Sequence, residues 1–367
     1  MNDMRDTQTE LQIIAKKIDA VLAAELPPDS GNIGEISVDG INTCEINIPL
    51  TAPCRTLIES GGKRWRPLLL VLFAGAAEND VENGAENPAY RITPLVEFAH
   101  NASLIHDDIE DASESRRGLP CAHITWGVDT ALNSGAYLYF EAANCVSNAG
   151  LTAATQNALY RTYFSHLRKL HRGQAMDIAW HRQTGFFPSV SDYMTMVKLK
   201  TGMLASLAVN AGLLCAAEKN NAAKSMLGDM QEKMSECMLE LGAAFQILDD
   251  VKNLTTGNPG KKRGDDIVEG KKSYPLLLHI RDNPQDAQRI TELFVRARHE
   301  GIQSQAIEQC IELLSGGTAA DNAIEKARQT AQTMLKTNVQ LLCDMSSHYL
   351  SQRSAALIEA VFLSFLQ

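Results

Sequence analysis

Residues 100–120 have the sequence HNASLIHDDIEDASESRRGLP, in which an apolar segment ends in a group of carboxylates. On a helix, Asp107 and Asp111 would lie about 40° apart around the axis and project side by side, with Asp108 next to them. Neighbouring negative charges repel one another, at a higher cost where the helix is partly buried. A divalent cation removes that cost, and Mg²⁺ prefers carboxylate, water and phosphate oxygens. Alone, such a group is more often a solvated helix end than a metal site.

A second apolar segment, LGAAFQILDDVKNLTTG at residues 241–257, also ends in an aspartate pair. Gln246 lies one turn before Asp249, and Asn253 follows one turn later, where a third carboxylate would complete the pattern. The second group is therefore weaker evidence for a metal site than the first. Two such helix ends facing each other across a helical bundle could hold several Mg²⁺ ions and bind a diphosphate.

Clusters of cationic residues accompany the acidic groups. The densest is GGKRWRP at residues 61–67, and others are RRG at 116–118, KTG at 200–202 and KKRGDDIVEGKK at 261–272. Arginine binds diphosphate oxygens in a bidentate manner, and lysine supplies a point charge. Each cluster alone is most often a solvated surface patch. Together with the acidic groups, they indicate a pocket that holds one diphosphate through metal ions and another by direct cationic contacts.

The length and the residue pattern predict an all-α fold, a single large helical bundle. The chain has 367 residues, of which 45% are hydrophobic, enough for a large core. From about residue 54 onward, helix-forming residues dominate and alternating strand-like runs are rare. Turn-forming residues predict breaks between helices at 61–62, 79–87, 117–118, 184–190, 256–264 and 314–317.

The first 50 residues differ in character from the rest. Residues 7–26 have the apolar spacing of an amphipathic helix, and the stretch from Pro27 to Pro53, rich in Gly, Pro, Asn and Asp, resembles a linker. We therefore predict an N-terminal extension, helix plus loop, over residues 1–50 and an all-helical domain over residues 51–367.

Charge, cysteines and hydropathy exclude several classes of protein. The net charge of -10 disfavours nucleic-acid binding. Eight scattered cysteines without a CxxC pair disfavour a disulfide framework or a zinc site and favour a reducing cytoplasmic location. The N-terminus lacks the features of a signal peptide. The longest strongly apolar stretch, residues 67–77, is shorter than the about 20 residues of a membrane span. We expect no integral membrane segment.

Together the motifs resemble the polyprenyl synthetase family, the trans-isoprenyl diphosphate synthases. The matching segments, in the order of the family and between about residues 54 and 280, are GGKRWRP, SLIHDDIED with RRG, HRGQAMDIAW, KLKTG, FQILDD and GKKRGDDIVEGKKSYP. The resemblance implies an isoprenoid-synthase bundle with a central active-site cavity, and a homodimer as the default assembly. It also implies condensation of isopentenyl diphosphate with an allylic diphosphate, in which the allylic carbon ionises, condenses and loses a proton.

The resemblance assigns a metal site and an allylic site. Asp107 and Asp111 would ligate two Mg²⁺ ions on the allylic diphosphate, supported by Asp108, and Asp249 would ligate a third. The allylic diphosphate would contact Arg116, Lys200, Lys261 and Lys271.

The resemblance also assigns a second substrate site. Isopentenyl diphosphate would be held by Lys63, Arg66, His100 and Arg117. The polar groups near the reacting carbons, whose dipoles would stabilise an allylic cation, would be Thr201, Gln246 and Gln174, with Asp177 as a further wall residue.

The product would grow toward the residues that precede Asp107. Ala102 and Ser103 are small, so products longer than C15 are expected, and the large side chains that would form a deeper floor are Tyr139, Phe140 and His171. This pattern resembles geranylgeranyl diphosphate synthases and predicts a C20 product. A longer polyprenyl product remains an alternative, as does a class I terpene cyclase or a non-catalytic partner subunit. A cyclase would have no use for a second diphosphate site, so GGKRWRP and His100 argue against it.

Overall fold

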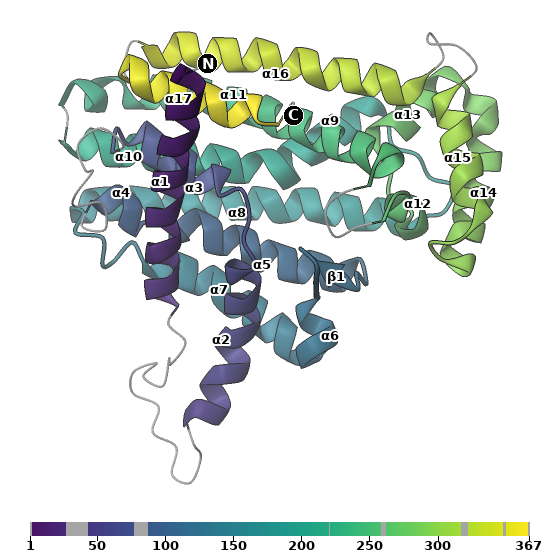
Figure 1. Cartoon of the computed structure of the whole chain (residues 1–367), viewed down its shortest axis with the longest axis horizontal. Coiled ribbons are helices and arrows are strands. Elements are labelled where there is room, and N and C mark those ends of the chain that lie inside the picture. The colour runs from purple at the N-terminus through teal and green to yellow at the C-terminus, as the bar shows by residue number, and fades with distance from the viewer. Residues whose placement is uncertain are drawn as a thin grey trace. The chain divides into compact units, whose positions relative to one another are not determined.

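The computed structural model describes residues 2–26, 43–76, 87–219, 221–257, 262–316, 322–347 and 350–365. In this part of the chain, helices account for nearly all regular structure, and the one sheet is a hairpin of two short strands. Figure 1 shows these helices and the hairpin, coloured from the N-terminus to the C-terminus. The prediction of an all-α fold is confirmed.

The residues cluster into two compact units. The first unit contains Met1–Ser165, Leu207–Ser235 and Cys343–Ser364, and the second contains His166–Ser206, Glu236–Leu342 and Phe365–Gln367. Four of the five boundaries fall inside helices, which are α8 (Ala153–Arg182), α10 (Met203–Lys219), α11 (Asn221–Thr255) and α16 (Ala323–Ser347). The fifth lies between Ser364 and Phe365.

The remaining elements of the first unit lie mostly in its N-terminal part, Met1–Ser165. They are α1 (Asn2–Glu25), α2 (Thr43–Glu59), α3 (Trp65–Phe73), α4 (Pro88–Arg91), α5 (Pro94–Glu110), β1 (Ser115–Arg116), β2 (Leu119–Pro120), α6 (Ala122–Trp126), α7 (Val128–Asn144) and α17 (Gln352–Leu363). The amphipathic helix predicted at residues 7–26 is confirmed, because α1 buries Ile14, Ile18 and Leu22. Helix α1 packs against α3, α5 and α17, so it belongs to this unit.

The linker predicted from Pro27 to Pro53 is wrong for residues 43–53, which form the first part of α2. A proline inside a helix removes a hydrogen bond and costs about 3 kcal/mol, which is why Pro49 and Pro53 indicated a loop. Packing compensates for that cost, since Cys54 is fully buried and Ser134 of α7 donates a hydrogen bond to the Leu50 carbonyl at 2.7 Å. The boundary predicted at residue 50 therefore lies within a helix.

The second unit has its own hydrophobic core. Its remaining elements are α9 (Val190–Val197), the π-helix η2 (Lys198–Gly202), α12 (Asp265–Glu269), α13 (Tyr274–Asp282), the 3-10 helix η3 (Pro284–Asp286), α14 (Ala287–Glu300) and α15 (Gln305–Ser315). Buried side chains such as Tyr193, Ile247, Leu277 and Phe294 form one continuous cluster. This core fixes the C-terminal half of α11, which carries the second aspartate pair.

Most predicted helix breaks agree with the structure. The break at 61–62 follows α2, the one at 117–118 is the β1–β2 turn, and the one at 184–190 separates α8 from α9. One helical stretch, Val190–Glu218, is long and apolar enough to cross a membrane, but 83% of its most apolar window is buried inside the protein. A buried core helix has the same composition, so the absence of a membrane segment stays a prediction.

Candidate active site

The acidic end of α5 divides its three aspartates between two environments. Asp107 and Asp111 are half-buried, whereas Asp108 is almost fully buried. The Asp108 carboxylate accepts a hydrogen bond from Nε of Arg116 at 2.9 Å and a second from the same guanidinium. Asp108 is therefore occupied by Arg116, and Asp107 and Asp111 are the carboxylates that a metal ion could reach.

The β1–β2 hairpin presents the two arginines that follow α5. Arg117 and Gly118 form its turn, with positive φ angles of 53° and 80°. Burial alone would lower the pKa of the Arg116 guanidinium. The neighbouring Asp108 carboxylate has the larger, opposite effect, so the pKa is raised. Arg116 therefore remains charged, and it also lies 3.6 Å from Asp107. A diphosphate bound at Asp107 would meet a cation that is already in place.

A cluster of basic groups fills the space between α2, α3 and α5 in the first unit. Arg66 donates a hydrogen bond to Nε2 of His100 at 3.3 Å and stacks on the Trp65 ring, 4.3 Å from its centroid. Arg117 donates to the Leu57 carbonyl at 2.9 Å. Lys63 is exposed in the loop before α3. The four residues predicted to hold isopentenyl diphosphate thus all lie in the first unit.

Positive charge exceeds negative charge in this basic cluster. Burial and the charge of Arg117 lower the pKa of Arg66 to about 10, even though Glu97 acts in the opposite direction. Burial also lowers the pKa of Arg117. Burial and four neighbouring arginines hold the pKa of His100 well below its ordinary value, so the imidazole is neutral near pH 7. Each of these pKa shifts makes the residue lose its proton more easily, in part because the neighbouring positive charges repel one another. An anion that binds in the basic cluster would reduce that repulsion.

One buried carboxylate organises the basic cluster, and the sequence did not reveal it. Glu97 of α5 accepts hydrogen bonds from Arg64 at 2.7 Å and from Asn101 at 3.1 Å. Arg117 donates to the Asn101 side chain at 3.4 Å. A single glutamate in an apolar helix has no sequence signature of such a role. The contacts of Glu97 and Asn101 are therefore known only from the folded structure, in which α5 lies beside the GGKRWRP loop.

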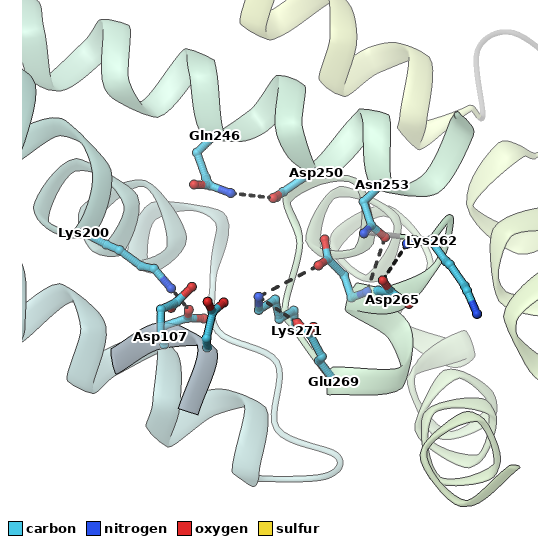
Figure 2. A network of polar contacts seen from close by, with 12 residues as sticks. Asp107, Lys200, Gln246, Asp250, Asn253, Lys262, Asp265, Glu269 and Lys271 are labelled. Carbon is cyan, nitrogen blue, oxygen red and sulfur yellow. Dashed lines mark hydrogen bonds and ion pairs between the residues drawn. The ribbon is translucent and has the colours of Figure 1, made fainter. Parts of the chain in front are cut away.

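In the second unit, a chain of hydrogen bonds runs from Thr201 to the second aspartate pair. The Thr201 hydroxyl donates to Gln246 at 3.0 Å, and Gln246 donates to Asp250 at 3.2 Å. Figure 2 shows the second of these bonds, on the helix that also carries Asn253. Thr201 and Gln246, predicted to lie near the reacting carbons, are thus in direct contact.

Asp250 is the structural member of the second aspartate pair. Its carboxylate accepts hydrogen bonds from the Tyr193 hydroxyl at 2.6 Å and from the backbone N–H of Tyr274 at 2.8 Å. Burial raises the pKa of Asp250 to about 6, although these hydrogen bonds favour the charged form. Asp249, by contrast, is half-buried. The second pair therefore offers Asp249 as its accessible carboxylate, in keeping with the role predicted for it.

Asn253 has a structural position that explains why no third aspartate occurs there. Its side chain is fully buried, and its amide oxygen accepts a 3.4 Å hydrogen bond from the backbone N–H of Asp266. Its backbone carbonyl also accepts from Gly264 at 2.9 Å. A carboxylate here would be a charge without access to water, which is costly unless it is paired. Asn253 instead fixes the start of α12 (Figure 2).

Lys200 is displayed by the π-helix η2. Its ammonium group donates to Asp177 of α8 at 2.6 Å, and Asp177 was predicted only as a wall residue. Three glycines let the backbones approach: a Cβ on Gly173 would lie 2.5 Å from the Lys200 nitrogen, and one on Gly242 would lie 2.5 Å from the Cα of Gly202. π-Helical turns within α-helices frequently occur at functional sites. Here the turn fixes Lys200 and Thr201 together.

The lysine-rich segment after α11 is only partly described. Lys271 forms an ion pair with Glu269 at 2.7 Å (Figure 2). Lys272 is buried and lies over the rings of Phe187 and Phe294, 5.1 and 5.2 Å from their centroids. Lys261, predicted to contact the allylic diphosphate, lies outside the described residues. Of Lys271 and Lys272, Lys271 is the less buried.

The predicted chain-length residues differ in exposure. Ala102 is fully buried, whereas Ser103 is half-buried and donates to the His100 carbonyl at 2.7 Å. The half-buried Tyr139 packs on His106, with ring centroids 5.7 Å apart. Phe140 is 72% exposed. In the second unit, His171 is exposed and Gln174 is half-buried.

The carboxylates fit a metal ion that is held jointly by protein and substrate. Among the residues that the structure describes, no group of three or more His, Cys, Asp and Glu side chains is arranged to hold a metal ion. Mg²⁺ ordinarily keeps several waters and binds through one or two carboxylates plus substrate phosphates. The half-buried Asp107 and Asp111 match that donor set, with hard oxygen ligands and room for others.

Comparison with known proteins supports the resemblance to the polyprenyl synthetase family independently of the site geometry. The polyprenyl synthetase family model matches residues 48–314. A geranylgeranyl pyrophosphate synthase of Gibberella zeae is 32% identical over 276 residues, which cover 73% of this chain and 68% of that protein.

Two solved structures share the fold. A geranylgeranyl pyrophosphate synthetase from Pyrococcus horikoshii has a TM-score of 0.77 at 24% identity, covering 99% of this chain and 98% of that one. A geranyltransferase from Helicobacter pylori, complexed with magnesium and isoprenyl diphosphate, has a TM-score of 0.65 at 18% identity, covering 97% and 96%. With a family model that spans most of its length and a relative that is similar over two thirds of both sequences, this chain belongs to the polyprenyl synthetase family.

Proposed function

We propose that this chain condenses isopentenyl diphosphate with an allylic diphosphate and releases geranylgeranyl diphosphate. Family membership supports a prenyl diphosphate synthase. One observation carries the assignment of the second substrate, namely the partly buried basic cluster of Arg66, His100 and Arg117 in the first unit. Burial lowers the pKa of each of these residues. A terpene cyclase, which binds one diphosphate, has no need of this cluster.

The basic cluster would hold the nucleophile by its diphosphate alone. Arg66 and Arg117 supply guanidinium donors, and the exposed Lys63 adds a third positive charge. The neutral His100 accepts from Arg66 through Nε2. Its ring thereby orients that guanidinium without adding a further positive charge. Holding the diphosphate end in this way leaves the apolar end of isopentenyl diphosphate free to meet the allylic carbon.

A divalent metal, which we propose to be Mg²⁺ in three ions, would neutralise the charge that develops on the departing allylic diphosphate. Asp107 and Asp111 would hold two of the ions, and the family resemblance assigns the third to Asp249. Arg116, Lys200 and Lys271 would bind the diphosphate oxygens directly. Each of these three cations is paired with a carboxylate, namely Asp108, Asp177 and Glu269 respectively. The pairing fixes the cations before the substrate arrives.

Two groups of the second unit would stabilise the allylic cation. The Thr201 hydroxyl donates to Gln246, so both side chains are held with fixed dipoles. A fixed dipole stabilises a developing charge without reorganising during the reaction. No protein nucleophile is required, and the departing diphosphate would accept the proton that the new bond releases.

The C20 product and a homodimer belong to the same proposal. The relatives named geranylgeranyl pyrophosphate synthase support the C20 product. The predicted floor residue Phe140 is 72% exposed, and Val128 and Leu132, which lie four residues apart on the same helix α7, are 54% and 53% exposed. Apolar side chains in such a row favour burial against another protein surface. A second copy of this chain would provide it.

The proposal is tested by incubating the protein with Mg²⁺, isopentenyl diphosphate and each allylic diphosphate from C5 to C15, and measuring product length. We expect a C20 product that disappears when the metal is chelated. Arg117→Met should raise the KM for isopentenyl diphosphate far more than the KM for the allylic substrate. Arg328→Met, which removes an exposed arginine paired with Glu325, is the matched control. Absence of any condensation with every allylic substrate would refute the function.

Assembly is tested separately by light scattering after size-exclusion chromatography. We expect a dimer, and Leu132→Glu should convert it to a monomer because the substitution places a charge in the apolar row of α7. A monomeric wild-type protein would exclude the proposed homodimer while leaving the catalytic proposal in place.

A further inference from the structure

The N-terminal helix contacts the loop that carries the isopentenyl diphosphate site. Asp19 of α1 accepts a hydrogen bond from Nε of Arg64 at 2.8 Å. Arg64 lies in the GGKRWRP loop directly after Lys63 and two residues before Arg66, both of which are assigned to the diphosphate. Neither the sequence pattern nor the family resemblance gave Arg64 or Asp19 a role.

Arg64 has the geometry of an anchor. Its φ angle is 49°, in the left-handed region that a residue other than glycine rarely adopts. A strained backbone persists only where its surroundings fix it. Three elements do so here, because the guanidinium donates to Asp19 of α1, to the Ile58 carbonyl of α2 and to Glu97 of α5. Only 5% of the side chain is exposed, and these three acceptors hold its guanidinium in place.

Arg64 is also linked to Arg117, the member of the basic cluster that lies on the β1–β2 hairpin. Glu97 accepts from both Arg64 and Asn101, and Asn101 accepts from Arg117. The loop also packs on both guanidiniums, since a Cβ on Gly62 would lie 3.2 Å from Arg117 and 3.5 Å from Arg64. A change in the position of Arg64 would therefore move Arg117 as well as Lys63 and Arg66.

We propose that Arg64 is a positioning residue for the isopentenyl diphosphate site, and that Asp19 makes the N-terminal helix α1 a part of that site. This inference rests on the proposed function. The loop binds isopentenyl diphosphate well only while Arg64 is held, and α1 supplies one of its three anchors. Residues 1–26 thus contribute to affinity for one of the two substrates.

Asp19 is the part of the anchor that can be changed without opening the core. Its side chain is 53% exposed, and it borders a cavity of about 300 Å³ whose lining includes Leu22, Arg55 and Glu59. Asp19→Asn therefore removes the negative charge from one of the three contacts of Arg64 and leaves Glu97 and the Ile58 carbonyl in place. Substituting Arg64 itself would leave Glu97 as an unpaired buried charge, which threatens folding.

The experiment compares Asp19→Asn, Asp19→Glu and the matched control Glu10→Gln in the full-length protein. Glu10 also lies on α1 and forms an ion pair, but with Arg353 of α17 at 2.9 Å. For Asp19→Asn we expect the KM for isopentenyl diphosphate to rise roughly three- to tenfold, with kcat and the allylic KM unchanged, because substrate binding must reorder the loop. Asp19→Glu should restore most of the loss, and Glu10→Gln should leave the KM for isopentenyl diphosphate at its wild-type value.

Two results would overturn the inference. One is an unchanged KM for isopentenyl diphosphate in Asp19→Asn, and the other is an equal change in Glu10→Gln, which would indicate only a general effect of α1 on stability. Calorimetric titration with inorganic diphosphate separates this inference from the proposed function. If the wild-type protein binds diphosphate without condensing any substrate, the proposed function fails. The affinities of wild type and Asp19→Asn would then still decide whether Arg64 is anchored through α1.

Discussion

At the scale of single residues, the adjacent aspartates of each acidic group have different environments. Asp108 and Asp250 are buried and hydrogen-bonded, whereas Asp107 and Asp249 are half-buried. Successive residues on a helix point about 100° apart, so one member of a pair faces the protein interior when the other faces outward. The buried member fixes a neighbouring segment, which is the β1–β2 hairpin for Asp108 and the start of α13 for Asp250.

Substitutions at Asp107 and Asp108 should separate catalysis from stability. Asp107→Asn should lower kcat by about 100-fold or more, because it removes a carboxylate that we propose as a metal ligand, while unfolding stays unchanged. Asp108→Asn should lower the free energy of unfolding by about 2 kcal/mol, because the partly buried Arg116 loses its anionic partner. Steady-state kinetics and urea unfolding of both variants check this. If the two variants lowered kcat equally and did not differ in stability, the assignment of Asp107 to catalysis and Asp108 to stability would be contradicted.

At the scale of elements, close approach of backbones positions two of the candidate site residues. The π-helix η2 displays Lys200 and Thr201, and it can pack on α11 only because Gly202 faces Gly242. Neither glycine has a positive φ angle, so the requirement is for space. The KLKTG segment could be matched to the family from its sequence, but the π-helix could not be predicted. Its wider turn depends on packing against α8 and α11.

Two glycines of α11 offer a matched pair of substitutions. Gly242→Ala should lower the free energy of unfolding by about 2 kcal/mol and reduce activity, because the new Cβ would lie 2.5 Å from the Gly202 backbone. Gly228→Ala should raise it by about 0.5–1 kcal/mol, because no atom lies within 4 Å of the new Cβ and alanine favours the helix. Denaturant unfolding and kcat of both variants test the prediction. Similar stabilities would show that the contact between η2 and α11 is adaptable.

Of the two small residues that precede Asp107 on α5, Ser103 should be the one that limits product length. Ser103 precedes Asp107 by four positions and lies about 40° from it around the helix, whereas Ala102 lies about 140° away. Ala102 is fully buried. Ser103→Phe should therefore shorten the main product from C20 to C15 with stability maintained. Ala102→Phe should destabilise the protein by about 1–3 kcal/mol through overpacking. Product chromatography and thermal unfolding distinguish the two, and an unchanged product in Ser103→Phe would exclude this wall.

At the scale of the whole molecule, stability should depend on a lysine that the proposed reaction does not use. Lys272 is buried over two phenylalanine rings. Burial, together with the charge of Arg298, lowers its pKa from 10.5 to about 8. The folded protein thus carries a buried charge at pH 7. Lys272→Met should raise the free energy of unfolding there by about 1 kcal/mol, after allowing for the lost cation–π contacts.

The pH dependence of this gain is a specific test. Between about pH 8 and 10.5, the unfolded chain keeps the Lys272 proton and the folded protein releases it, so the wild type gains stability as the pH rises. The advantage of Lys272→Met should therefore be largest below pH 8 and shrink toward pH 10. Urea unfolding at pH 7 and pH 9.5 measures it, with Lys262→Met, a change at an exposed lysine, as the control. A difference that does not vary with pH would contradict the explanation.

The sequence by itself determined the all-helical fold, most helix breaks and the residue types of the candidate site. These depend on local properties, such as apolar spacing, turn residues and the order of charged motifs along the chain. Packing decided the rest. Residues 43–53 form a helix despite two prolines because buried contacts offset their cost, and Asn253 is fully buried. Glu97, Arg64 and Asp19 are far apart in sequence and meet only in the folded chain, so no local pattern could have revealed their shared hydrogen bonds.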